Sequence, residues 1–171
     1  MSTTRIGTGA SKALAATLLA SAAAAQAQPL DTASATALVA PFYEALTASS
    51  ADAVALLLEQ STSPGWMNCS GDDACQSREQ TRQRWTARLA VVPDMKWARK
   101  EILVAGSRVV VRGEVSGVPV AAFLAQAPRG RAFRVMTIDV HEVADGRIVR
   151  TWHLEDWMGA QRQLSGPGGA K

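Results

Sequence analysis

The chain has 171 residues, of which 19% are charged, and its formal net charge is +3. Two of its positive charges, Arg5 and Lys12, lie close to the N-terminus, and without them the formal charge falls to +1. This balance excludes a basic nucleic-acid-binding protein, and the length suits one domain with a single core.

The first 27 residues have the pattern of a bacterial secretory signal peptide. Arg5 and Lys12 precede an Ala/Leu-rich run over 13–25, which ends at the small-x-small site Ala25-Gln26-Ala27. A membrane anchor would need about 20 strongly apolar residues, and this run is shorter and mostly alanine. We therefore expect cleavage near Ala27, a periplasmic or secreted protein, and no membrane association after cleavage. The rest of the chain is expected to form a linker (28–35), one domain (36–164) and a disordered tail (165–171).

Two helices are predicted next. Between Thr36 and Thr47, apolar residues recur at helical spacing: Leu38, Phe42 and Leu46. Pro41 marks the first turn of this helix or a kink in it. A second helix is expected to begin at Ser49-x-x-Asp52, which resembles a capping box, and to end at the segment STSPGW.

The two cysteines, Cys69 and Cys75, lie six positions apart in the polar loop NCSGDDAC. In an oxidising compartment this spacing favours a disulfide that closes a small loop. Free or metal-bound thiols are the alternative, but a zinc site would need two further ligands, and neither histidine is near in the sequence.

A third helix is predicted after the cysteine loop, where Ser77-x-x-Gln80 is a second capping signal. Trp85 and Leu89, with Thr81, form a narrow buried stripe. Four arginines occupy the other faces of this helix: Arg78, Arg82, Arg84 and Arg88. An arginine series at this spacing favours a solvated helix face, and an anion-binding role is the alternative.

After Pro93 the pattern changes from helical to alternating, which predicts strands joined by hairpins. The predicted strands are MKWARKEILVAG, RVVVRGEVSG, VPVAAFLAQ, AFRVMTIDVHEV and RIVRTWHLE, and Asp145-Gly146 is the strongest turn signal. Three helices followed by hairpins indicate an α+β fold in which helices cover one face of a curved antiparallel or mixed sheet. The mouth between helices and sheet is the expected pocket.

The segments FYEAL, SRVVVRGEVSG and IDVHEVADGRIVRTWHLEDWMGAQRQL together carry a resemblance to a known family. They are similar to the SnoaL-like polyketide cyclase or ester cyclase family, within the nuclear transport factor 2-like superfamily of cone-shaped α+β barrels. The family's C-terminal pattern matches the chain at Asp139, Asp145-Gly146, Ile148, Trp152, Asp156, Gly159, Gln163 and Leu164. The likeness spans most of 36–164, but only the last third is specific. The middle segment is shorter than in many members, and the cysteine loop, the arginine-rich helix and the export signal are not hallmarks of the family.

The resemblance implies that Asp156 is a general acid/base. In a regular last strand, Trp152, Leu154 and Asp156 share one face, and the resemblance makes it the pocket face. Asp156 also precedes a helical segment, WMGAQRQL, so its carboxylate is equally well placed to cap that helix. The two roles are compatible.

His141 and Asp139 share a face of the neighbouring strand, as either a structural pair or a second acid/base pair. His153 and Glu155 point the other way in a regular strand and are expected to be exposed or to face a dimer partner. The residues expected to contact a ligand are Phe42, Tyr43, Trp152, Leu154 and Trp157, although the tryptophans are core residues by default.

No sequence motif supports nucleotide, serine-hydrolase or zinc-hydrolase chemistry, so neither a cofactor nor a metal is expected. Two function classes remain. One is an enzyme that uses Asp156 as a base on a small, largely apolar carbonyl compound, for cyclisation, isomerisation or ester rearrangement. The other is a noncatalytic domain outside the cytoplasm that binds a small molecule or a partner. Apolar residues on both strand faces also predict a homodimer through the outer face of the sheet.

Overall fold

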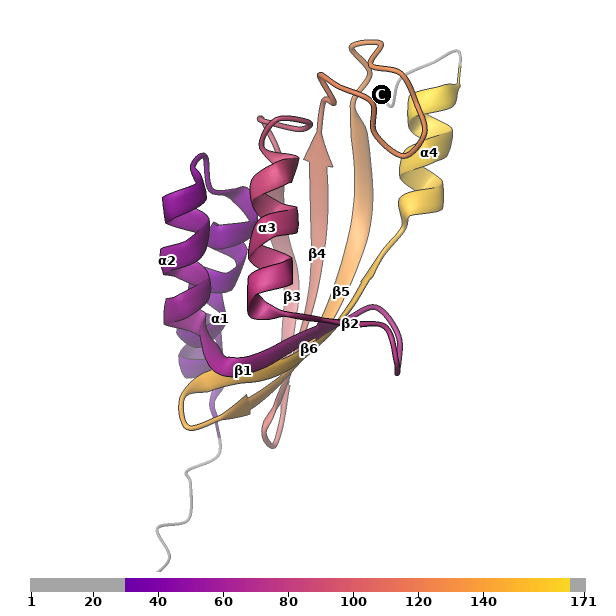
Figure 1. Cartoon of the computed structure of the whole chain (residues 1–171). Coiled ribbons are helices and arrows are strands. Elements are labelled where there is room, and N and C mark those ends of the chain that lie inside the picture. Colours follow the sequence, from indigo (N-terminus) through magenta and orange to yellow (C-terminus); the bar gives the residue numbers. More distant parts are fainter. Residues whose placement is uncertain (1–29, 167–171) are drawn as a thin grey trace, which may run out of the picture.

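Figure 1 shows the computed structural model, which describes residues 30–166. These residues form four helices and six strands, and the helices pack against an open, mixed sheet. The predicted α+β class, with helices on one face of a curved sheet, is confirmed. The predicted signal peptide (1–27) and nearly all of the predicted tail lie outside the described residues.

The first two helices, α1 (Thr32–Thr47) and α2 (Ala51–Ser61), have side-chain caps at their N-termini. The Asp31 carboxylate accepts from the backbone N–H of Ser34, and the Ser50 hydroxyl accepts from that of Ala53. The helix α1 therefore begins before the predicted Thr36, and the cap of α2 is Ser50 rather than Ser49.

The predicted loop NCSGDDAC is a loop over residues 70–74, but its two ends belong to strands. The strand β1 (Thr62–Cys69) pairs in parallel with the last strand, and β2 (Cys75–Ser77) pairs antiparallel with β1. Cys69 lies directly opposite Cys75 in this register, and the two form the predicted disulfide. Pro64 and Gly65 break the local strand pattern, so only pairing with a distant strand makes β1 a strand.

The third helix, α3 (Arg78–Arg88), begins with the predicted capping box between Ser77 and Gln80, and it buries Thr81 and Trp85. The expectation of a fully solvated arginine face is wrong for Arg88. The Nε and Nη2 atoms of Arg88 are buried and have no hydrogen-bond partner among the described residues.

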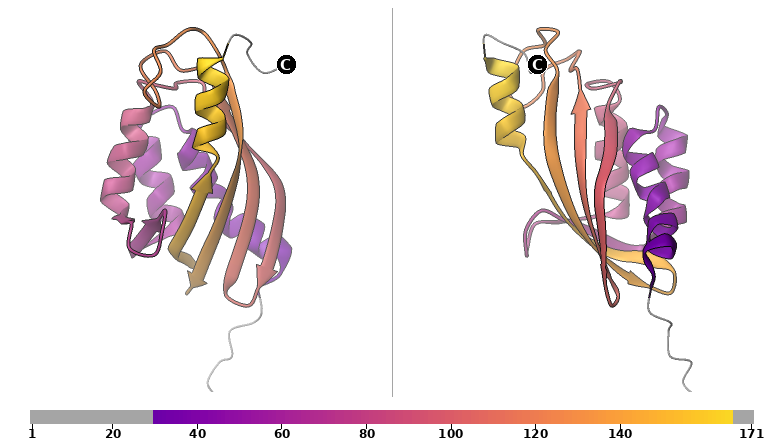
Figure 2. Two further views of the ribbon diagram at one scale, coloured as in Figure 1. Left: turned by 90° about the vertical axis from the view of Figure 1, so that its right-hand side faces the viewer. Right: turned by 180° about the vertical axis from the view of Figure 1, so that it is seen from behind.

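The remaining strands are β3 (Lys96–Ala105), β4 (Arg108–Gly117), β5 (Phe133–Ala144) and β6 (Arg147–Glu155), followed by α4 (Trp157–Ser165). The order in the sheet is β2-β1-β6-β5-β4-β3, with β1 and β6 parallel and every other neighbouring pair antiparallel. Asp145 and Gly146 both have positive φ in the β5–β6 turn, as their sequence predicts. Figure 2 shows α1, α2 and α3 on one side of the sheet and α4 beside the N-terminal end of β5.

The segment VPVAAFLAQ does not form the predicted strand. Apart from one isolated bridge between Phe123 and Gln126, residues 118–132 are a loop. Phe123 of this loop packs its ring against Phe133 and Trp157, and its segment does not pair with a strand of the sheet.

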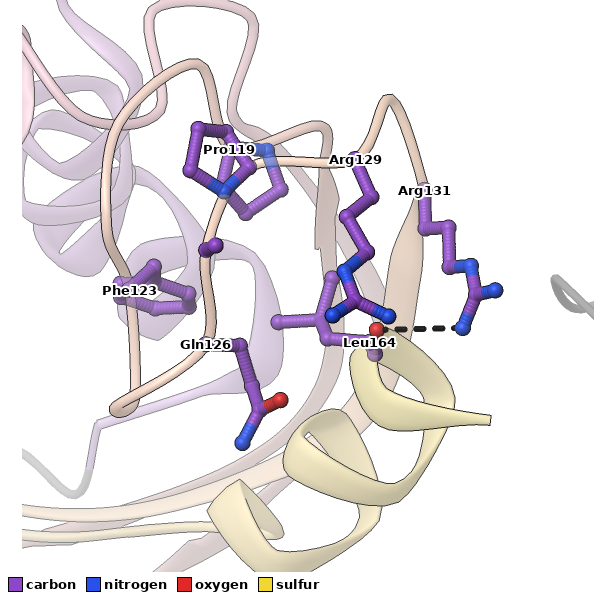
Figure 3. Close-up of a pocket in the computed structure, with 8 residues that line it drawn as sticks. Pro119, Phe123, Gln126, Arg129, Arg131 and Leu164 are labelled. Carbon is purple, nitrogen blue, oxygen red and sulfur yellow. Dashed lines mark hydrogen bonds between the residues drawn. The ribbon is translucent and has the colours of Figure 1, made fainter. Parts of the chain in front are cut away.

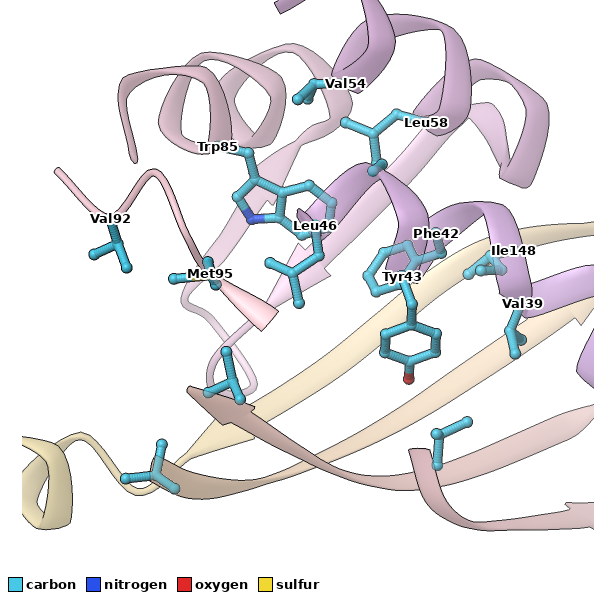
Figure 4. Packing of buried hydrophobic residues seen from close by; sticks show 14 of the residues in the cluster. Val39, Phe42, Tyr43, Leu46, Val54, Leu58, Trp85, Val92, Met95 and Ile148 are labelled. Carbon is cyan, nitrogen blue, oxygen red and sulfur yellow. The ribbon is translucent and has the colours of Figure 1, made fainter. Parts of the chain in front are cut away.

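The hydrophobic core fills the space between the helices and the inner face of the sheet (Figure 4). Phe42 lies at its centre and makes edge-on contacts with Trp66 and Trp85. On β4, Gly113 leaves room for the Trp97 indole, which a Cβ at this position would overlap. Tyr43 stacks on Trp97 with ring centroids 3.6 Å apart, and its hydroxyl points to the sheet.

Candidate functional site

An irregularity in β6 decides which of its side chains face the helices. The register with β5 shifts where Val143 pairs with Ile148 and Glu142 pairs with Arg150, which leaves Val149 as an extra residue. Beyond this bulge, Thr151, His153 and Glu155 point inward, whereas Trp152 and Leu154 point outward. The predicted pocket face of β6 is therefore the outer face, and Leu154 is 65% exposed there.

Asp139 is the centre of a polar network on the inner face. It lies on β5, is 1% exposed, and both of its carboxylate oxygens accept hydrogen bonds. The Tyr43 hydroxyl donates to Oδ2 over 2.9 Å, and Nδ1 of His153 lies 2.6 Å from Oδ1. The other ring nitrogen of His153, Nε2, lies 3.2 Å from Oε2 of Glu155.

A second branch of the network runs from Tyr43 through His141. Nε2 of His141 lies 2.9 Å from the Tyr43 hydroxyl, and its Nδ1 lies 3.0 Å from Oγ1 of Thr151. Trp66 Nε1, which can only donate, donates to the same Oγ1 over 3.0 Å. Because the Thr151 hydroxyl accepts from Trp66, one set of hydrogen-bond directions satisfies every group. The Thr151 hydroxyl donates to Nδ1 of His141, Nε2 of His141 donates to the Tyr43 hydroxyl, and that hydroxyl donates to Asp139.

The two histidines are in opposite charge states at neutral pH. Complete burial lowers the pKa of His141 to about 4, against the attraction of Asp139, so this ring is neutral. Burial also disfavours the charged form of His153, but hydrogen bonds to Asp139 and Glu155 and their negative charges outweigh it and raise the pKa to about 10. Burial and the negative charge of Asp139 raise the pKa of Tyr43 well above its ordinary value, so its hydroxyl stays protonated.

The His153 end of the network opens into a pocket of about 300 Å³. Its lining comes from β1, the disulfide hairpin, α3 and β6: Asn68, Cys69, Ser70, Asp73, Ala74, Cys75, Gln76, Arg84 and His153. The His153 side chain is 22% exposed, and Arg84 interacts with the charge of Glu155. The charged imidazolium is therefore the member of the network that faces the pocket.

A second hollow lies between the loop over 118–132 and α4, where Arg131 donates to the backbone oxygen of Leu164 (Figure 3). It has room for only about 10 Å³, which is at or below the ~10–15 Å³ that one water needs. This hollow is therefore too small for a ligand.

Comparison with known proteins agrees with this arrangement. Residues 37–164 match the SnoaL-like polyketide cyclase family. The chain belongs to this family. Its fold is the cone-shaped α+β fold of the nuclear transport factor 2-like superfamily, as the resemblance implied.

Several solved structures are similar to this SnoaL-like chain. TsrD from Streptomyces laurentii is 26% identical with a TM-score of 0.68, and the match covers 80% of this chain and 98% of TsrD. IdmH from Streptomyces antibioticus is 25% identical with a TM-score of 0.67, over 77% of this chain and 99% of IdmH. A protein from Jannaschia sp. CCS1, 18% identical with a TM-score of 0.69 over 84% and 99% of the two chains, shows the shared fold. No curated protein matches the chain.

In this SnoaL-like chain, the structure brings together only part of the predicted site. Asp139, His141 and Tyr43 form the network, and Phe42 packs edge-on against His141 with centroids 4.9 Å apart. Trp152 instead lies on the outer face, within 5.5 Å of the guanidinium carbons of Arg108 and Arg150. Trp157 packs beside Phe123 at the start of α4.

The predicted position of Asp156 in the pocket is corrected. Its Oδ1 accepts from the backbone N–H of Gly159 over 2.7 Å, so the side chain caps α4. The side chain is 52% exposed and makes no hydrogen bond to the Asp139 network. Gly159 suits this cap, because a Cβ there would overlap the carboxylate.

His153 and Glu155 are the site residues that the sequence pattern placed wrongly. Strict alternation from Ile148 turns both outward, and the one-residue bulge reverses them. One signal in the sequence was the charge pattern of TWHLE, whose two ionisable side chains alternate with apolar ones beside a predicted hairpin partner that carries Asp139 and His141.

Proposed function

We propose that this chain is a general acid–base enzyme of the cyclase or isomerase type, acting on a small carbonyl compound. The observation that carries the proposal is a charged histidine at the edge of a pocket, held between two carboxylates: His153, with Asp139 behind it and Glu155 beside it. Family membership and the similar structures support a cyclase or isomerase in general. Protein side chains supply both the acid and the base in this proposal.

The geometry suggests which group does which step. A substrate carbonyl that takes the Nε2–H of His153 in place of Glu155 would be polarised by the imidazolium. Glu155 Oε2, which lies 3.2 Å from Nε2, is then left without this donor and can accept the proton from the carbon next to the carbonyl. The Nε2 proton of His153 passes to the carbonyl oxygen, so the product of this step is an enol, with His153 neutral and the α-proton on Glu155.

Two outcomes balance this step without any redox partner. Return of the proton from Glu155 to a different carbon isomerises the compound. Attack of the enol carbon on a second carbonyl of the same molecule closes a ring, and the new alkoxide takes the α-proton from Glu155. In both outcomes the enol O–H proton returns to His153, which restores both residues. Asp139 orients His153 throughout, and Tyr43 and His141 position Asp139.

The test is exchange of α-protons into deuterated water by a panel of small ketones, followed by NMR. We expect the wild-type protein to accelerate exchange of at least one ketone, and Glu155→Gln and His153→Gln to lower the rate by about 10²-fold or more. Asp156→Asn is the matched control, because it removes a nearby carboxylate outside the network. Equal exchange rates in wild type and Glu155→Gln would contradict the proposal, and ketone binding without exchange would favour the noncatalytic class.

We also propose that the chain is exported. The signal-peptide pattern of residues 1–27 supports this, and so does the Cys69–Cys75 disulfide, because structural disulfides persist mainly in oxidising compartments. Among residues 30–166, no helix has the length and apolar character needed to cross a membrane. N-terminal sequencing of protein secreted by its native host should read from Gln28.

A homodimer through the outer face of the sheet is the third part of the proposal. Large apolar side chains that are at least one-third exposed lie on this face: Leu103, Met136, Ile138 and Leu154. Leu103, on β3, is connected to the others through its register neighbours Val110 and Val140. Ile138 lies directly opposite Leu154, and Trp152 lies opposite Val140 in the next row. A contiguous apolar surface of this kind marks an interaction site.

A further inference from the structure

The acid–base cluster of Asp139, His153 and Glu155 carries a negative charge that its own members do not neutralise. Asp139 is 1% exposed, the Glu155 side chain is 6% exposed, and the protonated His153 lies between them. Two carboxylates against one imidazolium leave one uncompensated negative charge. Tyr43 and His141, the other titratable members of the network, are neutral. Because a buried charge without a counter-charge is costly, we expect a further cation close by.

Arg84 on α3 is the cation that faces this cluster. It lines the same pocket as His153, and its charge interacts with that of Glu155. Asp73 also lines this pocket, but it does not contribute to the charge interactions of Arg84. Arg84 directly precedes the buried Trp85, so the packing of the indole fixes the side of α3 from which Arg84 extends. The positive charge of Arg84 therefore acts on the cluster and not on the loop over 70–74.

Arg84 acts on Glu155 through charge and not through a hydrogen bond. Within residues 30–166, its guanidinium makes no hydrogen bond or salt bridge, so it does not compete with His153 for Oε2 of Glu155. Burial lowers the pKa of Arg84 and the negative charge of Glu155 raises it, and a guanidinium stays protonated under both influences. As a whole residue Arg84 is exposed, so its own charge remains hydrated while it faces a buried one.

We infer that Arg84 is a positioning residue for the reaction, which acts through Glu155 by holding that side chain in its ionised form. The inference rests on the proposed function, in which Glu155 accepts the α-proton. Asp139 and Glu155 flank one imidazolium, and their like charges favour protonation of one of them. Asp139 accepts two hydrogen bonds, whereas His153 is the only described donor to Glu155, so Glu155 is the carboxylate that would take the proton first. The charge of Arg84 opposes this protonation.

The proposed reaction leaves the charge of the cluster unchanged. Before proton abstraction, the cluster holds two carboxylates and one imidazolium. Afterwards Glu155 has gained the α-proton and His153 has lost its Nε2 proton, so Asp139 is the only charged member. One negative charge remains in both states. Arg84 can therefore compensate the cluster throughout the step without moving.

The charge state of Glu155 can be measured without turnover. In protein labelled with ¹³C at the glutamate side-chain carboxyl, NMR gives the pH at which Glu155 takes up a proton, and Glu155→Gln assigns the signal. Arg84→Gln should raise this pH by about 0.5 or more, which is a change of about threefold in proton affinity. Arg84→Lys keeps the charge and should restore most of the wild-type behaviour. Arg78→Gln is the matched control, since it makes the same charge change on the same helix outside the pocket.

The pH dependence of ketone α-proton exchange gives the second measurement. Exchange in Arg84→Gln should be lowered most at acidic pH and should approach the wild-type rate as the pH rises, because Glu155 then ionises without help. A purely structural role of Arg84 would instead lower the rate by the same factor at every pH. The variant is expected to fold, since Arg84 is exposed and makes no hydrogen bond within the described part of the chain.

Three results would overturn the inference: an unchanged Glu155 titration in Arg84→Gln, an equal change in Arg78→Gln, or an Arg84→Lys variant that behaves like Arg84→Gln. Glu155-dependent exchange with any of these results would remove the inference and leave the proposed function. An Arg84-dependent titration of Glu155 in a protein that exchanges no ketone would remove the proposed function and leave Arg84 as the counter-charge of the cluster.

Discussion

Nδ1 of His153 lies 2.6 Å from Oδ1 of Asp139, and the two residues are directly opposite each other on β6 and β5. The pair joins the buried branch of the network to the pocket. Asp139 receives donors from Tyr43 on one oxygen and from His153 on the other, so His153 cannot rotate without losing a buried charge-assisted bond.

Asp139→Asn should therefore change the charge state of His153 and leave the fold intact. Loss of the largest favourable partner should lower the pKa of His153 from about 10 toward its ordinary value. Ketone α-proton exchange should fall by about 10²-fold or more, since the imidazolium is no longer fixed. NMR titration of the His153 ring gives the pKa directly, and an unchanged pKa would show that Asp139 does not set the charge state.

The two histidines predict a stability maximum near neutral pH. The folded pKa of His153, about 10, exceeds the ordinary value of 6.5, so its stabilisation is fully present below pH 6.5 and is lost as the pH rises through 10. The folded pKa of His141, about 4, lies below 6.5, so its contribution is present above 6.5 and is lost as the pH falls toward 4.

Chemical denaturation at acid, neutral and alkaline pH measures both limbs of this profile. His153→Gln should flatten the alkaline limb between pH 6.5 and 10 and leave the acid limb, which belongs to His141. A profile of wild type that rises from neutral pH toward pH 10 would contradict the assigned charge of His153.

The Cys69–Cys75 disulfide should contribute to the stability of the protein. The denatured, unreduced protein should show no free thiol among Cys69 and Cys75. Reduction should lower the free energy of unfolding by less than the ~3 kcal/mol expected for a 15-residue loop, because this loop is shorter. Two free thiols in the denatured, unreduced protein, or an unchanged free energy of unfolding after reduction, would contradict this prediction.

Asp156 should respond as a helix cap. Asparagine ranks with aspartate at an N-cap, so Asp156→Asn should cost no more than a few tenths of a kcal/mol, whereas Asp156→Ala should cost about 1 kcal/mol. Ketone exchange should be normal in both variants, since the side chain lies outside the network. A large loss of exchange in Asp156→Asn with normal stability would restore it as an acid/base residue.

The outer face of the sheet can be tested by charge insertion. Leu154→Lys should convert a dimer into a monomer in light scattering, since Leu154 is the most exposed of the large apolar side chains on this face. Leu56→Lys, which inserts the same charge at a leucine on α2 that is 56% exposed, should leave the oligomeric state unchanged. A monomeric wild type would refute the dimer.

Local patterns in the sequence were sufficient for much of the architecture. Helical spacing and capping residues located α1, α2 and α3, and Asp145-Gly146 located the β5–β6 hairpin, because these signals act between residues close in the chain. The Cys69–Cys75 disulfide was predicted for the same reason, since its two cysteines are only six positions apart. Motif spacing placed the chain in its family, because the C-terminal pattern is unusual enough to be specific.

Only the tertiary structure decided the site. The strand β1 exists because it pairs with β6, 83 to 86 positions along the chain, and nothing local in TSPGWMNC indicates that pairing. The bulge at Val149 turns His153 and Glu155 inward and Trp152 and Leu154 outward, and a one-residue shift of this kind leaves no periodic trace in the sequence. The residues that face the pocket therefore follow from how β6 is packed between β1 and β5, since burial against two neighbours overrides simple alternation.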